Sequence, residues 1–127
     1  MDIYNENFTI LLDKKQKKIA LSCILVRERE EQDNFTLAKY IHEAIIQYNF
    51  HIRKLGLHLE EKERTPTVSY TFRLNKKIRK DAEFSIRIRN KVKISLSRFI
   101  NEAVKYHNAI VRRQTALPKD LRIKIKG

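Results

Sequence analysis

Two segments that alternate between apolar and polar residues carry the side chains with the most distinctive chemistry. Residues 68–74 alternate strictly, and residues 7–12 alternate except at Leu11. A period of two predicts half-buried strands whose successive side chains point to opposite faces. One face of the two strands would hold Asn7, Thr9, Leu11, Ser69, Thr71 and Arg73. Arginine can bond guanine through two donors, asparagine can pair with adenine, and threonine or leucine can contact a thymine methyl, so these types suit base edges.

A basic residue occupies the same early position in two predicted helices. Lys39 and Arg98 each stand three residues after a predicted N-cap. A cation there opposes the helix dipole, at a cost of roughly 0.3 kcal/mol or more. A phosphate group at the helix end would offset that cost, because amides there already favour an anion. The alternative is an ion pair with a glutamate one helical turn later, Lys39 with Glu43 and Arg98 with Glu102, which stabilises a helix by about 0.2–0.5 kcal/mol. A phosphate contact and such an ion pair can be present at once.

These residues belong to a sequence pattern that occurs twice in the chain. Residues 35–45 match residues 94–104 at a separation of 59, and residues 8–15 match residues 70–77 at a separation of 62. The first copy therefore has three additional residues between its matched blocks. An internal repeat decides the architecture, so we expect two copies of one small unit.

Each copy is predicted to continue from its strand into two helices. Asp13 and Asn75 are expected N-caps of the first helix in each copy, and Thr36 and Ser95 are expected N-caps of the second. In the second copy the first helix should run to about Asn90, whereas in the first copy it should end in a charged loop at residues 27–33. Residues 83–89 alternate locally like a strand, but their match in the first copy does not, which favours helix.

Apolar stripes at spacings of three and four define the inner faces of these helices. We expect the strands to turn Phe8, Ile10, Leu12, Tyr70, Phe72 and Leu74 towards the same core. The stripes of the first helices are Ile19, Ala20, Cys23, Ile24 and Val26, and Ile78, Ala82, Ser85 and Ile86. Those of the second helices are Leu37, Tyr40, Ile41, Ala44, Ile45 and Tyr48, and Leu96, Phe99, Ile100, Ala103, Val104 and His107.

Charge is unevenly distributed along the chain. Residues 1–64 hold 11 basic and 11 acidic residues, whereas residues 65–127 hold 17 and 4, so the formal net charge of +13 arises in the second half. Such an excess of positive charge indicates a polyanionic partner, most often nucleic acid. A single cysteine, with no apolar run resembling a signal peptide or a membrane span, predicts a cytoplasmic protein without membrane contact.

Nothing in the sequence indicates catalysis. The four histidines have no metal-ligand spacing with one another or with Cys23, and His107 falls on a core stripe. There is no nucleophile–base–carboxylate set and no glycine-rich phosphate loop. We expect no enzyme activity, no metal and no cofactor.

The two copies resemble the ribbon-helix-helix family of DNA-binding proteins, which place a two-stranded ribbon in the major groove. The resemblance covers residues 7–49 and 69–108, and the run L-N-K-K-I…I-S-L-S-R-F-I-N-E-A-V of the second copy is its more specific part. It implies an α+β, mostly helical fold in which two tandem units share an antiparallel ribbon and a four-helix core. The expected parts are unit 1 (residues 1–56), a linker (57–67), unit 2 (68–113) and a basic C-terminal tail (114–127).

The same resemblance assigns roles to the candidate residues. It implies base contacts for the six outward strand residues. It implies phosphate contacts at the helix ends by Thr36, Lys39, Ser95, Ser97, Arg98, Lys76 and Lys77. Because the two strands differ, the preferred DNA site should be asymmetric, with a guanine-containing half under the second strand and a looser half under the first.

We therefore expect a sequence-specific double-stranded DNA-binding protein. The tandem format is similar to that of TraY-type conjugation accessory proteins, which implies a relaxosome accessory role with a relaxase or other mobile-element protein as partner; a repressor of a mobile element is the other setting. The alternatives are a basic RNA-binding or ribosome-associated protein, an antitoxin, or an enzyme-bound scaffold. The sequence leaves open a monomeric pseudo-dimer and a homodimer that exchanges strands.

Overall fold

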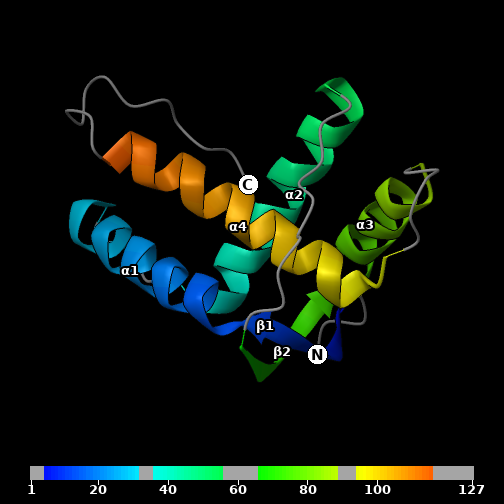
Figure 1. Cartoon of the computed structure of the whole chain (residues 1–127), viewed down its shortest axis with the longest axis horizontal. Helices are drawn as coiled ribbons and strands as arrows, with labels where there is room; N and C mark the ends of the chain where they lie inside the picture. Colours follow the sequence, from blue (N-terminus) through cyan, green and yellow to red (C-terminus); the bar gives the residue numbers. More distant parts are fainter. Residues whose placement is uncertain (1–4, 32–35, 56–65, 89–93, 116–127) are drawn as a thin grey trace.

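The chain folds into the order strand, helix, helix, and then repeats it (Figure 1). The structure, a computed structural model, describes residues 5–31, 36–55, 66–88 and 94–115. Its elements are β1 (Asn5–Asp13), α1 (Lys14–Glu31), α2 (Leu37–Leu55), β2 (Thr67–Asn75), α3 (Lys76–Ile88) and α4 (Leu96–Thr115). The predicted α+β, mostly helical class is confirmed. Most of the predicted linker and tail, residues 57–65 and 116–127, lies outside the described residues. The predicted boundaries were wrong by one or two residues at each described side, because Thr67 already pairs with Asp13 in the ribbon and α4 continues to Thr115.

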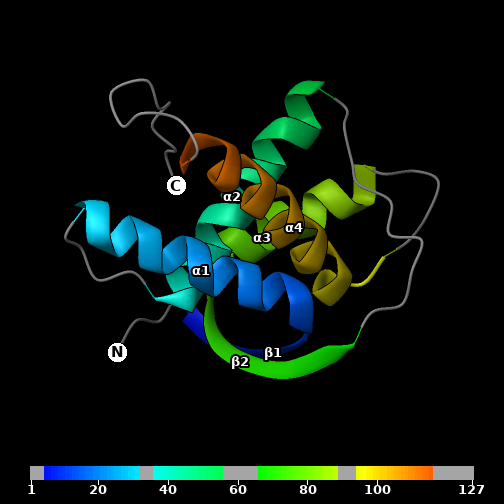
Figure 2. The same cartoon turned by 60° about the vertical axis from the view of Figure 1, so that its left-hand side comes forward.

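The two strands pair with each other inside one chain, as an antiparallel ribbon. The register is centred on Thr9 opposite Thr71 and runs from Asn5 opposite Asn75 to Asp13 opposite Thr67. Figure 2 shows the curved ribbon at one edge of the molecule, with helices α1 to α4 on one face of the ribbon. Equivalent residues of the two copies are thus related by an approximate twofold axis through the centre of the ribbon.

The alternation of the strands sorts their side chains as predicted. Ile10, Leu12 and Leu74 are at most 1% exposed, and Phe72 is 5% exposed. Phe8 and Tyr70 are half-buried and pack against the same core. The ribbon therefore contributes one apolar face to a core that only the helices can complete.

Each of the helices α1 to α4 begins at a side-chain cap. Asp13 Oδ1 accepts a hydrogen bond from the Gln16 amide (2.9 Å), and Asn75 Oδ1 accepts from the amides of Lys77 and Ile78 (2.9 and 3.2 Å). At α2 the Lys39 amide donates to the Thr36 hydroxyl (3.2 Å), and at α4 the Arg98 amide donates to the Ser95 hydroxyl (3.1 Å). The predicted N-caps are confirmed, which fixes where each strand gives way to helix.

The end of α1 differs from the prediction. Residues 27–31, expected in a charged loop, form the last turns of α1, which continues to Glu31. Tertiary contact explains this difference, because the Arg27 guanidinium lies on α1 and bonds both carboxylate oxygens of Glu43 on α2 at 2.8 Å. The charged sequence alone gave no sign of that partner.

The helical prediction for residues 83–88 is confirmed. The local strand-like alternation leaves Phe84 and Ile88 exposed (47% and 43%), whereas Ile86 packs against the core. Ala82 and Ser85 are fully buried on the predicted inner face. Packing of the inner stripe therefore favours helix here, although it leaves two large apolar side chains exposed.

The helices of the two units interleave. α1 packs mainly against α4, α3 packs mainly against α2, and α2 and α4 pack against each other at the centre. The first helix of each unit thus covers the second helix of the other unit, so neither unit can bury its apolar faces alone. Within the described ranges, no helix is both long and apolar enough to span a lipid bilayer.

The position of Phe72 yields a stability prediction. Its ring is 5% exposed, stacks on Tyr70 at 5.5 Å between centroids and meets the edge of His42 at 5.7 Å. Phe72→Ala should lower the free energy of unfolding by about 3–5 kcal/mol, because truncation leaves a cavity. The control is Leu11→Ala, at a 60% exposed position of the opposite strand face, which should change stability by less than about 0.5 kcal/mol. Equal losses in urea unfolding would mean that the strand faces are assigned wrongly.

Candidate nucleic-acid interface

The outer face of the ribbon forms the candidate interface. All six residues that the alternation assigned outward are exposed: Asn7, Thr9, Leu11, Ser69, Thr71 and Arg73. At the centre the Thr9 and Thr71 hydroxyls share a hydrogen bond of 2.7 Å. This bond uses one hydroxyl proton, so the pair retains one hydrogen-bond donor and several acceptor sites for a ligand.

The register sorts the outer residues by ribbon end and not by strand. Asn7 lies opposite Arg73 at one end, and Leu11 lies opposite Ser69 at the other. We call these the Asn7/Arg73 end and the Leu11/Ser69 end. One end combines an amide with a guanidinium, and the other combines an apolar side chain with a small hydroxyl. The chemical contrast that the sequence suggested between strands therefore lies between the ends of the ribbon.

Two polar side chains, buried Asn101 and half-buried His42, attach the starts of α4 and α2 to the ribbon. Asn101 of α4 accepts from the Asp13 amide (2.7 Å) and donates to the Leu11 carbonyl (2.7 Å). At the equivalent position of α2, His42 Nε2 accepts from the Asn75 amide (3.1 Å), while its Nδ1 donates to the Ala38 carbonyl (2.7 Å). These bonds place a helix N-terminus beside each ribbon end, α4 at the Leu11/Ser69 end and α2 at the Asn7/Arg73 end, as Figure 2 shows.

His42 and Asn101 were not among the predicted site residues. The signal that could have found them is their shared position in the repeat, one turn past the first cation of each second helix. Both are polar residues on a side of the helix that faces the strands. A histidine and an asparagine can each accept a backbone N–H there, so different residue types perform the same task.

The predicted phosphate-contact residues lie at these helix starts. Thr36, Lys39, Ser95 and Arg98 are exposed around the first turns of α2 and α4. Ser97 is half-buried, and its hydroxyl accepts from the Leu11 amide (3.1 Å), which leaves its proton for another acceptor. The first amides of a helix have no intrahelical partner, so both starts can bind an anion.

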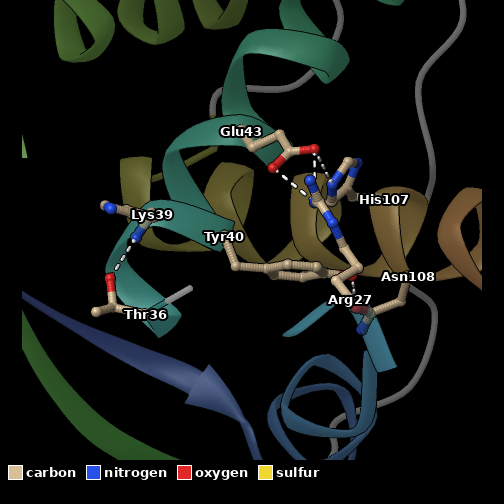
Figure 3. A network of polar contacts seen from close by, with 7 residues as sticks. All are labelled: Arg27, Thr36, Lys39, Tyr40, Glu43, His107 and Asn108. Carbon is tan, nitrogen blue, oxygen red and sulfur yellow. Dashed lines mark hydrogen bonds and ion pairs between the residues drawn. The ribbon is translucent and has the colours of Figure 1, made fainter. Parts of the chain in front are cut away.

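The local-pair alternative is wrong for Lys39. Glu43 points into the protein, where Arg27 binds it at 2.8 Å and His107 Nε2 lies 3.4 Å from its Oε1 (Figure 3). The Lys39 ammonium points away from this cluster and is exposed. The helix cation therefore remains available to an external anion.

The basic residues that follow the strands are divided between the two ribbon ends. Lys76 and Lys77 are exposed at the start of α3, directly after β2, and lie at the Asn7/Arg73 end. Lys14 and Lys15 are exposed at the start of α1 and lie at the Leu11/Ser69 end. Although the charge excess belongs to the second half of the sequence, the antiparallel ribbon gives both of its ends a pair of cations.

Two further cations make contacts with aromatic rings of the ribbon. Arg79 lies over the Phe8 ring (5.1 Å) and pairs with Glu6 and Glu83, and the equivalent Lys17 lies over the Tyr70 ring (5.8 Å). Each cation of one unit covers the edge aromatic of the other unit's strand. These contacts close the sides of the ribbon and leave its outer face as the accessible surface.

Behind the interface, equivalent positions hold different polar pairs. Glu43 contacts His107, and the equivalent Glu102, fully buried, accepts from the Tyr48 hydroxyl (2.9 Å). Burial acts to raise the pKa of Glu43, but the neighbouring His107 ring and the hydrogen bonds from Arg27 lower it by more, so its pKa lies below the usual range. Glu43 is therefore a buried carboxylate whose charge depends on its partners.

No metal centre was found within the described ranges, where His, Cys, Asp and Glu side chains form no group of three able to hold an ion. Comparisons with protein-family models, with curated proteins and with solved structures found no match. The function is therefore inferred from the chemistry and geometry of the ribbon and the helix ends.

The Glu43 cluster yields a pH prediction. Arg27→Met should lower the free energy of unfolding by about 3 kcal/mol at pH 7, because it leaves a buried carboxylate without its main cation. A carboxyl group whose pKa is depressed by folding stabilises the fold above its unfolded pKa of about 4.3 and loses that contribution as pH falls through the folded value. The deficit of the variant should therefore shrink between pH 7 and about pH 3.

Urea unfolding of Arg27→Met and of Arg29→Met at both pH values would test this. Arg29 is exposed on the same helix, so its variant should differ from the parent by less than about 0.5 kcal/mol. A deficit of the Arg27 variant that is equally large in acid would show that packing, and not charge, makes Arg27 important.

Proposed function

We propose that this protein is a tandem ribbon-helix-helix protein that binds double-stranded DNA by inserting the β1–β2 ribbon into the major groove. The observation that carries the proposal is the outer face of the ribbon, where every exposed side chain has a type that can contact a base edge. The major groove is about 12 Å wide and admits a two-stranded ribbon. The two strands of a sheet lie about 4.8 Å apart, which leaves room for their side chains.

The helix ends support the same docking. The starts of α2 and α4 are fixed beside opposite ribbon ends by His42 and Asn101, and each carries an exposed cation in its first turn, Lys39 or Arg98. A ribbon in the groove would bring the flanking phosphates to these ends, where free amides and a cation favour an anion. Phosphate contacts fix the register, and base contacts supply the sequence preference.

RNA recognition is less well supported. Stacking platforms for unpaired bases need exposed aromatic rings on the binding face. On this ribbon the rings of Phe8, Tyr70 and Phe72 belong to the inner face. The major groove of A-form RNA is also too narrow for a ribbon to read.

The biological setting we propose follows from the resemblance of the tandem format. The two settings are a relaxosome accessory factor, with a relaxase or other mobile-element protein as partner, and a repressor of a mobile element, both of which bind duplex DNA without catalysis. The buried Cys23 is compatible with a reducing cytoplasm. Detection of the bound locus by chromatin immunoprecipitation would separate a transfer origin from a promoter.

The contrast between the ribbon ends predicts an asymmetric DNA site. The half under the Asn7/Arg73 end should contain a guanine for Arg73 next to an adenine for Asn7, and the half under the Leu11/Ser69 end should prefer a thymine methyl. Selection of binding sites from random duplexes should recover these unequal halves. Arg73→Ala should remove the guanine preference at a cost of about 1–3 kcal/mol, while Leu11→Ala should affect only the other half.

Two results would contradict the prediction of an asymmetric site read by Arg73. Perfect inverted repeats among the best sites would mean that like strands are paired by exchange between two chains. An equal loss of affinity for all sequences on Arg73→Ala would make Arg73 a phosphate contact.

The helix ends and the lysine pairs predict a strong salt dependence. If about six to eight phosphates are neutralised, log K against log[salt] should have a slope of about −5 to −7 for duplex DNA. Lys76→Gln/Lys77→Gln should make the slope shallower by about two, and Lys39→Gln by about one. Lys105→Gln, on an exposed part of α4 beyond its first turns, should leave the slope unchanged. A flat slope, or tighter binding to single-stranded RNA than to any duplex, would refute DNA recognition by this surface.

A further inference from the structure

An apolar groove of about 450 Å³ lies between α2 and α3. Its apolar lining comes from Ile46, Phe50 and Ile78, and its polar edge includes Arg53 and Lys54. Figures 1 and 2 both show the C-terminal part of α2, which carries these α2 residues, rising away from the ribbon. The DNA-binding face proposed above does not include this groove.

The groove is bordered by large exposed rings. Phe50 is 56% exposed and Phe84 is 47% exposed, and Ile46 is 36% exposed beside them. Arg53 lies 4.9 Å from the centroid of the Phe84 ring, and Lys54 lies 5.2 Å from that of Phe50. An apolar surface with a charged border is typical of an interaction site.

The approximate twofold axis supplies an internal control for this surface. The residues at the equivalent positions of the α1–α4 face are Lys105 for Ile46, Ala109 for Phe50, Gln16 for Ile78 and Ser22 for Phe84. All four are polar or small, and the fold places Gln16 against the Asn108 amide (3.0 Å). The fold therefore does not require apolar residues at these four positions. A ligand bound to this face would account for their apolar character on α2 and α3.

The charges of the groove indicate the chemistry of that ligand. Arg53, Lys54 and Arg87 border the two rings, and Arg87 lies 6.0 Å from the Phe84 centroid. Asp81 is the acidic residue of the lining, and Arg53 donates to its backbone carbonyl (2.9 Å) and lies 3.9 Å from its carboxylate, an exposed pair that leaves Lys54 and Arg87 as the further cations of the border. A ligand with carboxylates around an apolar stripe would meet these cations without displacing them from the rings. A groove between two helices accepts an amphipathic helix in this way.

We propose that the α2–α3 groove is a docking site for an acidic amphipathic helix of a partner protein. The partner would place apolar side chains between Ile46, Phe50 and Ile78, and carboxylates on Arg53 and Lys54. Unpaired nucleic acid fits less well, because the cations already lie over the rings on which bases would stack. A second copy of this chain fits less well too, because two bodies of net charge +13 repel each other.

The test is a titration of the full chain, without DNA, by a synthetic amphipathic helical peptide with leucine and phenylalanine on one face and glutamate elsewhere. Amide shifts in ¹H–¹⁵N spectra should be confined to α2 and α3. A peptide with the same apolar residues but lysine in place of glutamate should bind at least about tenfold more weakly, because the border is basic.

Matched variants separate the groove from general hydrophobicity. Phe50→Ala/Phe84→Ser, which copies the residues of the opposite face, should weaken binding of the acidic peptide at least about tenfold. Leu21→Ala/Leu25→Ala, at exposed positions of α1 (42% and 56%), should leave binding unchanged. Because these four positions are exposed, retained thermal unfolding profiles are expected and would be checked first.

Four outcomes would overturn the proposal. The acidic peptide could bind nowhere, or it could shift only ribbon and helix-start amides and so act as a phosphate mimic. A single-stranded oligonucleotide could shift the α2 and α3 amides more strongly than the peptide. Sedimentation could show self-association that Phe50→Ala/Phe84→Ser abolishes. Because the titration is read at the α2 and α3 amides without DNA, failure of this proposal is distinguishable from failure of the ribbon to bind duplex DNA.

Discussion

The antiparallel pairing of β1 with β2 is the constraint on which the rest of the structure depends. A single strand with one apolar face cannot bury that face, and a two-stranded ribbon needs helices to cover it. Pairing about Thr9 and Thr71 sets Asp13 and Asn75 at opposite ends of the ribbon, and each caps the helix that follows it. The two halves of the molecule are therefore placed by one sheet, and the interleaved helices complete a single core over it.

At several polar positions around that core, the two copies differ in residue type or in hydrogen-bond partner. His42 and Asn101 accept the backbone amide at the end of a strand, one with a ring nitrogen and the other with an amide oxygen. Glu43 is held by Arg27 with His107 nearby, whereas Glu102 is held by the Tyr48 hydroxyl. Geometry tolerates such differences because each buried polar group needs only a partner in the correct place. The two halves could thus diverge while the ribbon remained intact.

The surface also differs between the two halves. The ribbon presents an amide and a guanidinium at one end, and a leucine and a serine at the other. On the helices, Phe50 is apolar and exposed where the equivalent residue, Ala109, is small. A single chain can vary each half independently, which two identical chains cannot do. In our proposals the unequal ribbon ends select an asymmetric DNA site, and the unequal helix faces bind a partner on one side only.

The sequence by itself determined the local structure and the faces of its elements. Periods of two and of three to four residues, together with Asp13, Thr36, Asn75 and Ser95, specified the strands, the helix starts and the buried stripes, because these features act over a few residues. It also identified the six exposed ribbon residues as candidate base contacts.

Tertiary structure alone decided which of these features meet. The register joined Asn7 to Arg73 and so divided the candidate interface by ribbon end, and Arg27 extended α1 because Glu43 lies across from it. The pairing of each first helix with the other unit's second helix created the α2–α3 groove. Such contacts link residues far apart in the chain, and no local period or cap encodes the distance between them.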